Sequence, residues 1–286
     1  ITNSNINDSW GRGFYSKNDT GTLNFNVTNS QFKNAFNKAN GGSNFIFEGY
    51  GSSNNTLTLK GNDFSNAKEY GLTLNFGDTS TNTIQIGGNT AGDGNTINGA
   101  ISSPGSNGLS LQSNGNATVN YNIIRNTLKS SFNGSFPCLV GNQGTLTMNG
   151  RINFNIIEGA GINTLSNGIH VAAYGNANHV TEISNNTITN AGNYGIFSEA
   201  NDNGISGSGR MDATIKNNTI TVPENSYANL GVVSYADNTA STMKNAANIA
   251  GNITNTPTVI ASGTFNVFSS GTNSEVILQG VTAYVN

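Results

Sequence analysis

Short runs in which polar and apolar residues alternate are the most regular feature of this chain. Residues 184–190 read Ser-Asn-Asn-Thr-Ile-Thr-Asn, and residues 216–221 repeat this as Lys-Asn-Asn-Thr-Ile-Thr. Alternation with a period of two is typical of β-strands. Glycine, asparagine and serine separate these runs, and such residues favour turns. The pattern therefore predicts many short strands joined by turns.

One phrase, Asn-x-Ile or Asn-x-Phe, recurs along most of the sequence and sets a repeat. Its apolar residue is taken as a core anchor, beginning at Ile6. The further anchors are Phe32, Phe64, Ile97, Ile124, Ile157, Ile188, Ile220 and Ile253. Their spacings range from 26 to 33 residues and average about 31. A period of this length predicts a solenoid.

Two further strand-like runs lie between consecutive anchors. One begins at a glycine about 8 to 15 residues after the anchor, as in residues 168–171, and the other precedes the next anchor, as in residues 57–59. We therefore predict an all-β parallel solenoid of about nine coils, with three strands and ~31 residues per coil. Residues 1–257 carry the repeats. Residues 258–286 keep the alternation but lose the phrase, so we expect them to continue the solenoid or to form a C-terminal cap.

Asparagine stands near the anchor, two residues before it, in six consecutive repeats. These positions are Asn62, Asn95, Asn122, Asn155, Asn186 and Asn218. Stacked coils place equivalent residues one strand spacing apart, so amide side chains can hydrogen bond from coil to coil. Such a ladder satisfies amides that would be costly to bury singly. We expect these six residues to be structural.

The repeat in residues 185–190 and the run Gly195-Ile196-Phe197 resemble the repeats of the pectate-lyase-like superfamily. This resemblance covers nearly the whole chain and implies a right-handed parallel β-helix. The superfamily includes polysaccharide lyases, glycoside hydrolases, phage tailspikes, autotransporter passengers and large surface adhesins. A shared fold does not choose among these activities.

Composition narrows the possible partners. Only 9% of the residues are charged, with 12 Lys plus Arg against 15 Asp plus Glu, and the net charge is -3. Without basic runs, nucleic acid is not an expected partner, because binding a phosphate backbone needs clustered Lys and Arg. No apolar stretch is long enough for a transmembrane helix, so membrane insertion is not expected. The start of the sequence lacks the features of a signal peptide, which indicates a mature or excised chain.

Metals and cofactors are not expected either. The two histidines are nine residues apart and have no cysteine nearby, which argues against a zinc site. Residues 202–204 and 89–95 faintly resemble calcium loops, but each carries a single acid, and glycine-rich turns explain both. Cys138 is the only cysteine, and we expect it to be a buried apolar residue. Arg125 and Glu158 each follow an anchor directly, so they are predicted to form a surface ion pair.

Candidate catalytic residues are concentrated in coils six to eight. His170 lies between Ile169 and Val171, so it points outward if those two residues point inward. Glu199 lies on the following coil, diagonally across from His170, and Asp202 is close in sequence. A histidine paired with a carboxylate could bind a sugar or act as acid and base. The alternative is an outward histidine with an ordinary surface environment.

A structural or adhesive role fits this sequence best. We expect a segment of a bacterial cell-surface or secreted protein that presents polar stripes to glycans, with no enzymatic activity. Exposed strand edges would pair with flanking repeats or neighbouring copies, which predicts stacking into a filament or extracellular fibre. The alternative is a polysaccharide lyase or glycoside hydrolase with its groove at His170, Glu199 and Asp202. A third interpretation, ice binding through outward threonines, rests on only two coils.

Overall fold

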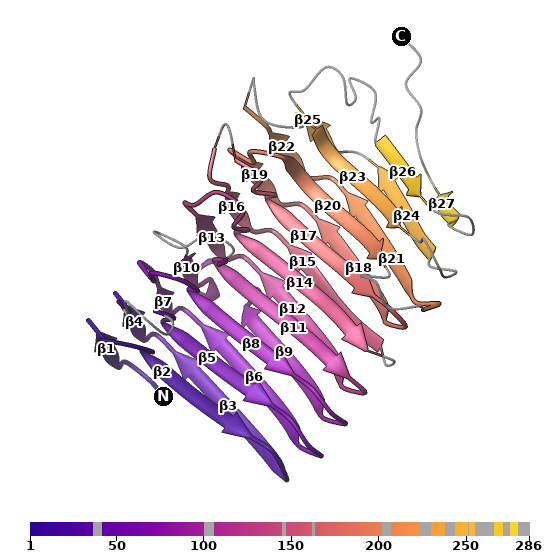
Figure 1. Cartoon of the computed structure of the whole chain (residues 1–286). Helices are drawn as coiled ribbons and strands as arrows, with labels where there is room; N and C mark the ends of the chain where they lie inside the picture. Colours follow the sequence, from indigo (N-terminus) through magenta and orange to yellow (C-terminus); the bar gives the residue numbers. More distant parts are fainter. Residues whose placement is uncertain are drawn as a thin grey trace.

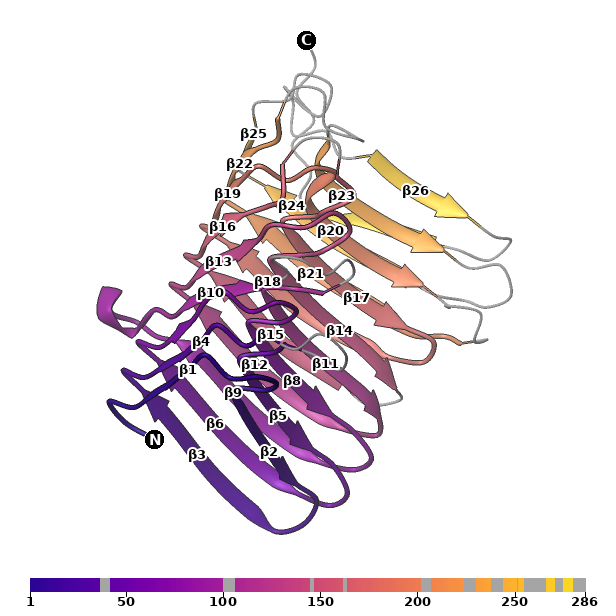
Figure 2. The ribbon, with the colours of Figure 1, turned by 60° about the vertical axis from the view of Figure 1, so that its left-hand side comes forward.

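The computed structural model shows a chain wound into a stack of parallel strands. It describes residues 1–36, 42–99, 106–144, 147–161, 164–201, 207–223, 230–237, 244–250, 252–254, 266–270 and 275–279. In Figures 1 and 2 the windings follow one another from the indigo N-terminal end to the yellow C-terminal end. The predicted fold class, a right-handed parallel β-helix, is confirmed.

Three parallel sheets of nine strands each build the solenoid, and each winding adds one strand to every sheet. The short strands form sheet I: β1 (Asn5–Asn7), β4 (Gln31–Lys33), β7 (Asp63–Phe64), β10 (Thr96–Gly99), β13 (Thr127–Ser130), β16 (Ile156–Glu158), β19 (Thr187–Thr189), β22 (Thr219–Thr221) and β25 (Ile253–Thr254). Sheet II contains β2 (Phe14–Asn18), β5 (Phe45–Gly49), β8 (Leu72–Phe76), β11 (Leu109–Gly115), β14 (Cys138–Gly144), β17 (Ile169–Tyr174), β20 (Tyr194–Asn201), β23 (Leu230–Asp237) and β26 (Asn266–Ser270). Sheet III contains β3 (Thr22–Thr28), β6 (Asn54–Lys60), β9 (Thr81–Gly87), β12 (Thr118–Ile124), β15 (Thr147–Asn153), β18 (Asn178–Ser184), β21 (Arg210–Lys216), β24 (Lys244–Ala250) and β27 (Glu275–Gln279).

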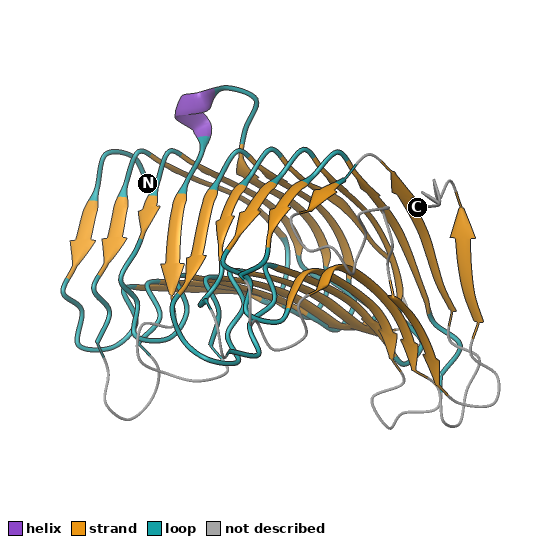
Figure 3. Ribbon diagram, turned by 90° about the horizontal axis from the view of Figure 1, so that it is seen from above, coloured by secondary structure: helices purple, strands orange, loops and turns teal. Residues whose placement is uncertain are grey.

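Helical structure in the described part of the chain is limited to one turn, η1 (Ala91–Asp93), which projects from the solenoid between β9 and β10 (Figure 3). Most of residues 258–286 lie outside the described residues, apart from β26 and β27. The predicted division of the chain at residue 257 therefore stays a prediction.

Apolar side chains from all three sheets fill the inside of the coil as stacked columns. On sheet I the column runs from Ile6 through Phe32 and Phe64 to Ile97. Its members from Phe32 onward are fully buried. A solenoid buries its core only by stacking neighbours, so each such column couples one winding to the next.

The fifth repeat departs from the predicted register. Opposite Ile97 and Ile157 the structure places Leu128, which is fully buried, and not Ile124. Ile124 is instead the last residue of β12, and Asn122 lies on the same strand, opposite Arg151. The phrase occurs twice here, as residues 122–124 and again, with leucine, as residues 126–128. The chain turns between them, so only the second copy reaches sheet I.

A left-handed residue marks the turn between sheets III and I in four of the windings. Arg125, Phe154, Asn185 and Asn217 all have φ between 55° and 59°, and each immediately precedes a ladder asparagine. In the last winding the register also differs from the prediction, because Thr254 lies opposite Ile220, whereas Ile253 lies opposite Thr219. The Ile253 side chain lies outside the described residues.

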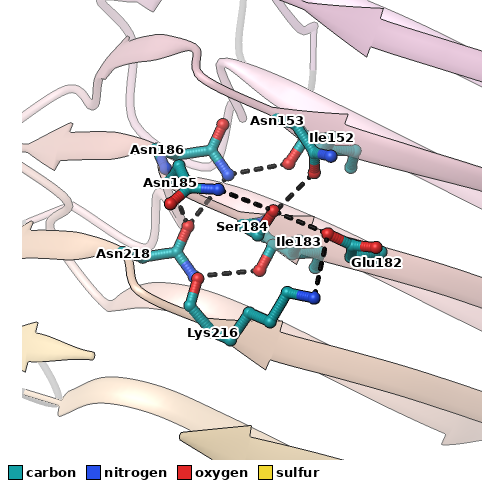
Figure 4. A network of polar contacts seen from close by, with 9 residues as sticks. All are labelled: Ile152, Asn153, Glu182, Ile183, Ser184, Asn185, Asn186, Lys216 and Asn218. Carbon is teal, nitrogen blue, oxygen red and sulfur yellow. Dashed lines mark hydrogen bonds and ion pairs between the residues drawn. The ribbon is translucent and has the colours of Figure 1, made fainter. Parts of the chain in front are cut away.

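The asparagine ladder is present at the turn between sheets III and I. Its members are Asn62, Asn95, Asn126, Asn155, Asn186, Asn218 and Asn252. Each of the first six donates its backbone N–H and its Nδ2 to the Oδ1 of the next, as Asn186 does to Asn218 at 3.0 and 2.9 Å. The second Nδ2 hydrogen reaches a strand-end carbonyl, here that of Ile152 (Figure 4). Asn126 thus replaces the predicted Asn122, and the other five predicted positions belong to the ladder.

One polar network lies within the apolar interior. The Oη of Tyr121 is 2.9 Å from His179 Nε2 and 2.7 Å from Thr181 Oγ1, two windings away. Gly150 occupies the intervening position of the same column, and its missing side chain leaves room for the tyrosine ring. Complete burial lowers the pKa of His179 to about 4, although its hydrogen bond to the Ala172 carbonyl opposes the shift. The histidine is therefore neutral at pH 7.

Candidate functional site

The outer face of sheet II carries a line of neighbouring cavities, which we call the outer groove. The first cavity, about 520 Å³, lies over β5, β8 and β11. The second, about 180 Å³, shares Asn75 and Gln112 with the first. The third, about 300 Å³, shares Gln143 and Tyr174 with the second. The shared residues make the three cavities a continuous path, which follows the stacking axis from the first cavity to the second and ends at the turns that follow β11, β14 and β17.

Strand alternation explains why polar side chains line this groove. Leu74 and Leu111 point into the core, so the next residues, Asn75 and Gln112, point outward. These two residues are paired in register on adjacent strands. Gln143 and Tyr174 are paired in the same way on β14 and β17. Successive windings thus present amide or tyrosine groups about 4.8 Å apart.

Charged groups are concentrated in the first cavity. Its described lining includes Arg12, Glu48 and Glu69, whereas the other two cavities are lined by uncharged residues among those described. Tyr15 donates a 2.8 Å hydrogen bond to Oε2 of Glu48, and the Arg12 guanidinium lies 4.9 Å from the centre of the Tyr15 ring. These contacts link side chains of two adjacent windings at the groove's N-terminal end.

Tyr70 completes the wall of this cavity. Burial raises the pKa of Tyr70, and the negative charge of Glu69 raises it further. Its hydroxyl therefore stays protonated and can donate a hydrogen bond.

At the opposite end, Tyr174 connects the groove to a buried pair. His170 Nε2 lies 2.8 Å from Glu199 Oε1, and the hydroxyl of Tyr174 donates to the same oxygen at 2.7 Å. The rings of Phe136 and Phe197 cover His170, each with its centroid 5.0 Å away. His170 is only 8% exposed and Glu199 only 6%.

The electrostatics of this pair favour an ionised glutamate. Burial by itself would raise the pKa of Glu199. The hydrogen bond and charge of His170, followed by the hydrogen bonds of Tyr174 and Asn201, outweigh burial and lower that pKa below its ordinary value. Burial and the nearby Glu199 charge raise the pKa of Tyr174. Tyr174 therefore acts as a hydrogen-bond donor to a carboxylate.

Two of the three predicted catalytic residues are thus brought together by the fold. His170 points outward as expected, but aromatic rings shield it from solvent, so it is not an ordinary surface histidine. Asp202 lies outside the described residues. A catalytic role for His170, Glu199 and Asp202 stays a prediction.

The predicted ion pair between Arg125 and Glu158 is wrong. Glu158 pairs with Lys129 at 2.9 Å, because these two residues are in register on β13 and β16. The Arg125 guanidinium instead lies over the Phe154 ring, 4.8 Å from its centre. The error follows from the shifted register of the fifth repeat. Cys138 is buried in the core between Leu109 and Ile169, and burial raises its pKa to about 12.

Glu48 and Glu199 are too far apart to act together as the two carboxyl groups of a glycosidase. Glu48 and Glu199 occupy the same outward column, but β5 and β20 are five strand spacings apart, or about 24 Å. Glycosidases use two carboxyl groups about 5 to 10 Å apart. Among the described residues around His170, Glu199 is the only carboxylate. The described cluster therefore contains one carboxylate and one imidazole.

Sequence reasoning missed the first cavity. Glu48 could have been found by aligning the outward positions of sheet II, since it precedes Asn75 and Gln112 in one column. Arg12, Glu69 and Tyr70 come from loops, whose paths the repeat does not define.

Two other features are absent from the described residues. These residues contain no group of three or more His, Cys, Asp or Glu side chains that could hold a metal ion. They also contain no helix long and apolar enough to cross a membrane.

Comparison with known proteins found no matching family model, no matching curated protein and no matching solved structure. The chain is a parallel β-solenoid. Its relation to pectate-lyase-like proteins, adhesins or autotransporter passengers stays a prediction.

Proposed function

We propose that this chain is a glycan-binding segment of a bacterial cell-surface or secreted β-solenoid, and that it holds glycans along the outer groove without cleaving them. The observation that carries this proposal is the groove itself, in which amide and tyrosine side chains repeat at the strand spacing over several windings.

The chemistry of the lining suits saccharides. Sugar hydroxyls both donate and accept hydrogen bonds, and so do the amides of Asn75, Gln112 and Gln143. Tyrosine rings add an apolar face with a polar tip, which suits a ligand that has both kinds of surface. The side chains stand on a rigid parallel sheet, so little ordering is needed when a ligand binds. A groove that follows the stacking axis fits an extended chain better than a single small molecule.

Location and assembly are part of the same proposal. The only cysteine of the chain is buried, so the solenoid depends on no disulfide. Because few of its residues are charged, its polar surface suits uncharged, hydroxyl-rich ligands. We place it at the cell surface or outside the cell. Stacking of such rods on neighbouring copies or on flanking repeats stays a prediction.

The test is retention of neutral, soluble polysaccharides by the immobilised chain, compared with a groove variant. Gln112→Ala with Gln143→Ala removes two exposed groove amides on adjacent strands. The matched control is Thr83→Ala with Asn120→Ala, which removes two exposed polar groups paired on adjacent strands of sheet III. We expect at least one polysaccharide to be retained, with affinity reduced about tenfold or more by the groove variant only. Failure to retain any polysaccharide, or equal loss in both variants, would refute the proposal.

A second candidate, cleavage of a polysaccharide, is favoured by the 2.8 Å contact between His170 and Glu199 at the end of the groove. It predicts that reducing or unsaturated ends are released, and that Glu199→Gln abolishes the release while the circular dichroism of the chain is unchanged. Retention without release supports binding alone.

A further inference from the structure

We propose that the first cavity of the outer groove binds a saccharide unit that carries a protonated amine, so that the groove prefers an aminated glycan to a neutral or uronate-containing one. This inference rests on the proposed function, because it assumes that the ligand is a glycan. It adds which chemical class of sugar the N-terminal end of the groove selects.

Charge balance in the cavity is the first observation. Two carboxylates and one guanidinium line it, so the described lining is net negative. The other two cavities have no charged lining residue among those described. The charged side chains that line the groove, among those described, are therefore those of the first cavity. A uronate there would face Glu48 and Glu69, and like charges repel.

Glu69 is the residue that we expect to contact the amine. Its side chain is half-buried in the cavity wall and forms no ion pair with any described residue. Its neighbour Tyr70 supplies an aromatic wall and a protonated hydroxyl. An ammonium group that enters the cavity would give Glu69 a partner. A hydrogen bond between two ionised groups is about twice as strong as one between neutral groups.

A hydrogen bond from Tyr15 positions the side chain of Glu48. Tyr15 donates to only one of its oxygens, Oε2. The Arg12 guanidinium lies over the Tyr15 ring, so its charge is directed toward an aromatic face and makes no ion pair with Glu48. The Arg12 guanidinium thus contacts Tyr15 and forms no ion pair with either cavity carboxylate.

The cavity is large enough for this role. Its volume of about 520 Å³ is within the range of small-ligand sites. Outward hydroxyl and amide groups of Thr73, Asn75, Ser110 and Gln112 form its floor. These groups would accept and donate hydrogen bonds to the hydroxyls of the same sugar.

The experiment is a calorimetric titration of the purified chain with four hexasaccharides at mildly acidic pH. A glucosamine oligomer carries amines, its N-acetylated counterpart has the same linkage without charge, a glucose oligomer is neutral, and a galacturonate oligomer is anionic. We expect the glucosamine oligomer to bind about tenfold or more tightly than the glucose and N-acetylated oligomers. We expect the galacturonate oligomer to bind weakest. Added salt should narrow the difference, because it screens charges.

Variants assign this preference to the cavity. Glu69→Gln and Glu48→Gln keep the size of the side chain but remove its charge, so each should reduce the preference for the glucosamine oligomer over the glucose oligomer. Glu158→Gln is the control, because this glutamate lies on sheet I and pairs with Lys129. Matching urea midpoints would show that each variant is folded.

The outcomes separate the two proposals. If neutral oligomers bind in the groove but glucosamine has no advantage, or if Glu69→Gln leaves its advantage intact, the amine inference is overturned and the proposed function stands. If no oligosaccharide binds, both are overturned. A preference that both cavity variants reduce and Glu158→Gln does not supports the inference.

Discussion

Removal of one ladder asparagine gives the sharpest test of how this solenoid is held together. Asn126 is fully enclosed at the turn, and its Oδ1 accepts hydrogen bonds from the backbone N–H and Nδ2 of Asn95. Its Nδ2 donates to the carbonyl of Ile86 at 3.0 Å and to Asn155 Oδ1 at 3.1 Å. Asn126→Ala therefore leaves two buried backbone groups without these partners, the N–H of Asn95 and the C=O of Ile86.

The cost follows from those two groups. An unsatisfied buried donor or acceptor costs about 1–3 kcal/mol, so we expect Asn126→Ala to lower the free energy of unfolding by about 2–6 kcal/mol. Asn122→Ala is the matched control, because Asn122 is the asparagine that the repeat phrase itself had indicated. Its side chain only accepts a 2.7 Å hydrogen bond from the exposed Arg151. Its loss should change stability by about 0.5 kcal/mol or less.

The assay is urea denaturation followed by circular dichroism, with midpoints and slopes compared among the wild type and the two variants. A large loss for Asn126→Ala with little change for Asn122→Ala is the expected result. Equal effects, or a larger effect at Asn122, would show that the ladder register described above is wrong.

Other interior features predict further effects. Folding lowers the pKa of His179 to about 4, so the unfolded chain binds a proton that the folded chain does not bind as pH falls below about 6.5. The free energy of unfolding should therefore be full above about pH 6.5 and decline by about 3 kcal/mol by pH 4. His179→Gln should flatten this decline. Gly150→Ala should lower the free energy of unfolding by about 1–3 kcal/mol or more, because the new Cβ would lie 2.5 Å from the Tyr121 ring. A lower urea midpoint than that of the wild type would show this loss. Cys138 should react with a thiol reagent only after unfolding, because it is buried and its pKa is raised to about 12, and reaction in the absence of denaturant would contradict its burial.

The fold could be predicted from the sequence because its repeat is redundant. The strand alternation, the turn residues and the recurring phrase all indicate the same winding, so a single ambiguous unit does not change the result. The register of one unit could not be predicted, because residues 122–124 and 126–128 both fit the phrase. Only the position of the turn, at the left-handed Arg125, decides between them.

The candidate site could be predicted only where it lies on strands. His170 and Glu199 are diagonal neighbours on adjacent strands, and strand geometry alone brings them close. Their burial could not be predicted, since it depends on Phe136, which precedes β14 in a loop. Arg12 and Glu69 were missed for the same reason.

The location of a bound glycan tests the account most directly. Hydroxyl-radical footprinting compares the oxidation of aromatic side chains with and without a retained polysaccharide. Tyr50, Tyr70 and Tyr174 line the outer groove, whereas Phe154 is exposed at the turn between sheets III and I. The account predicts that the glycan protects the three tyrosines and leaves Phe154 unchanged. Unchanged oxidation of all three tyrosines in the presence of a bound glycan would contradict it.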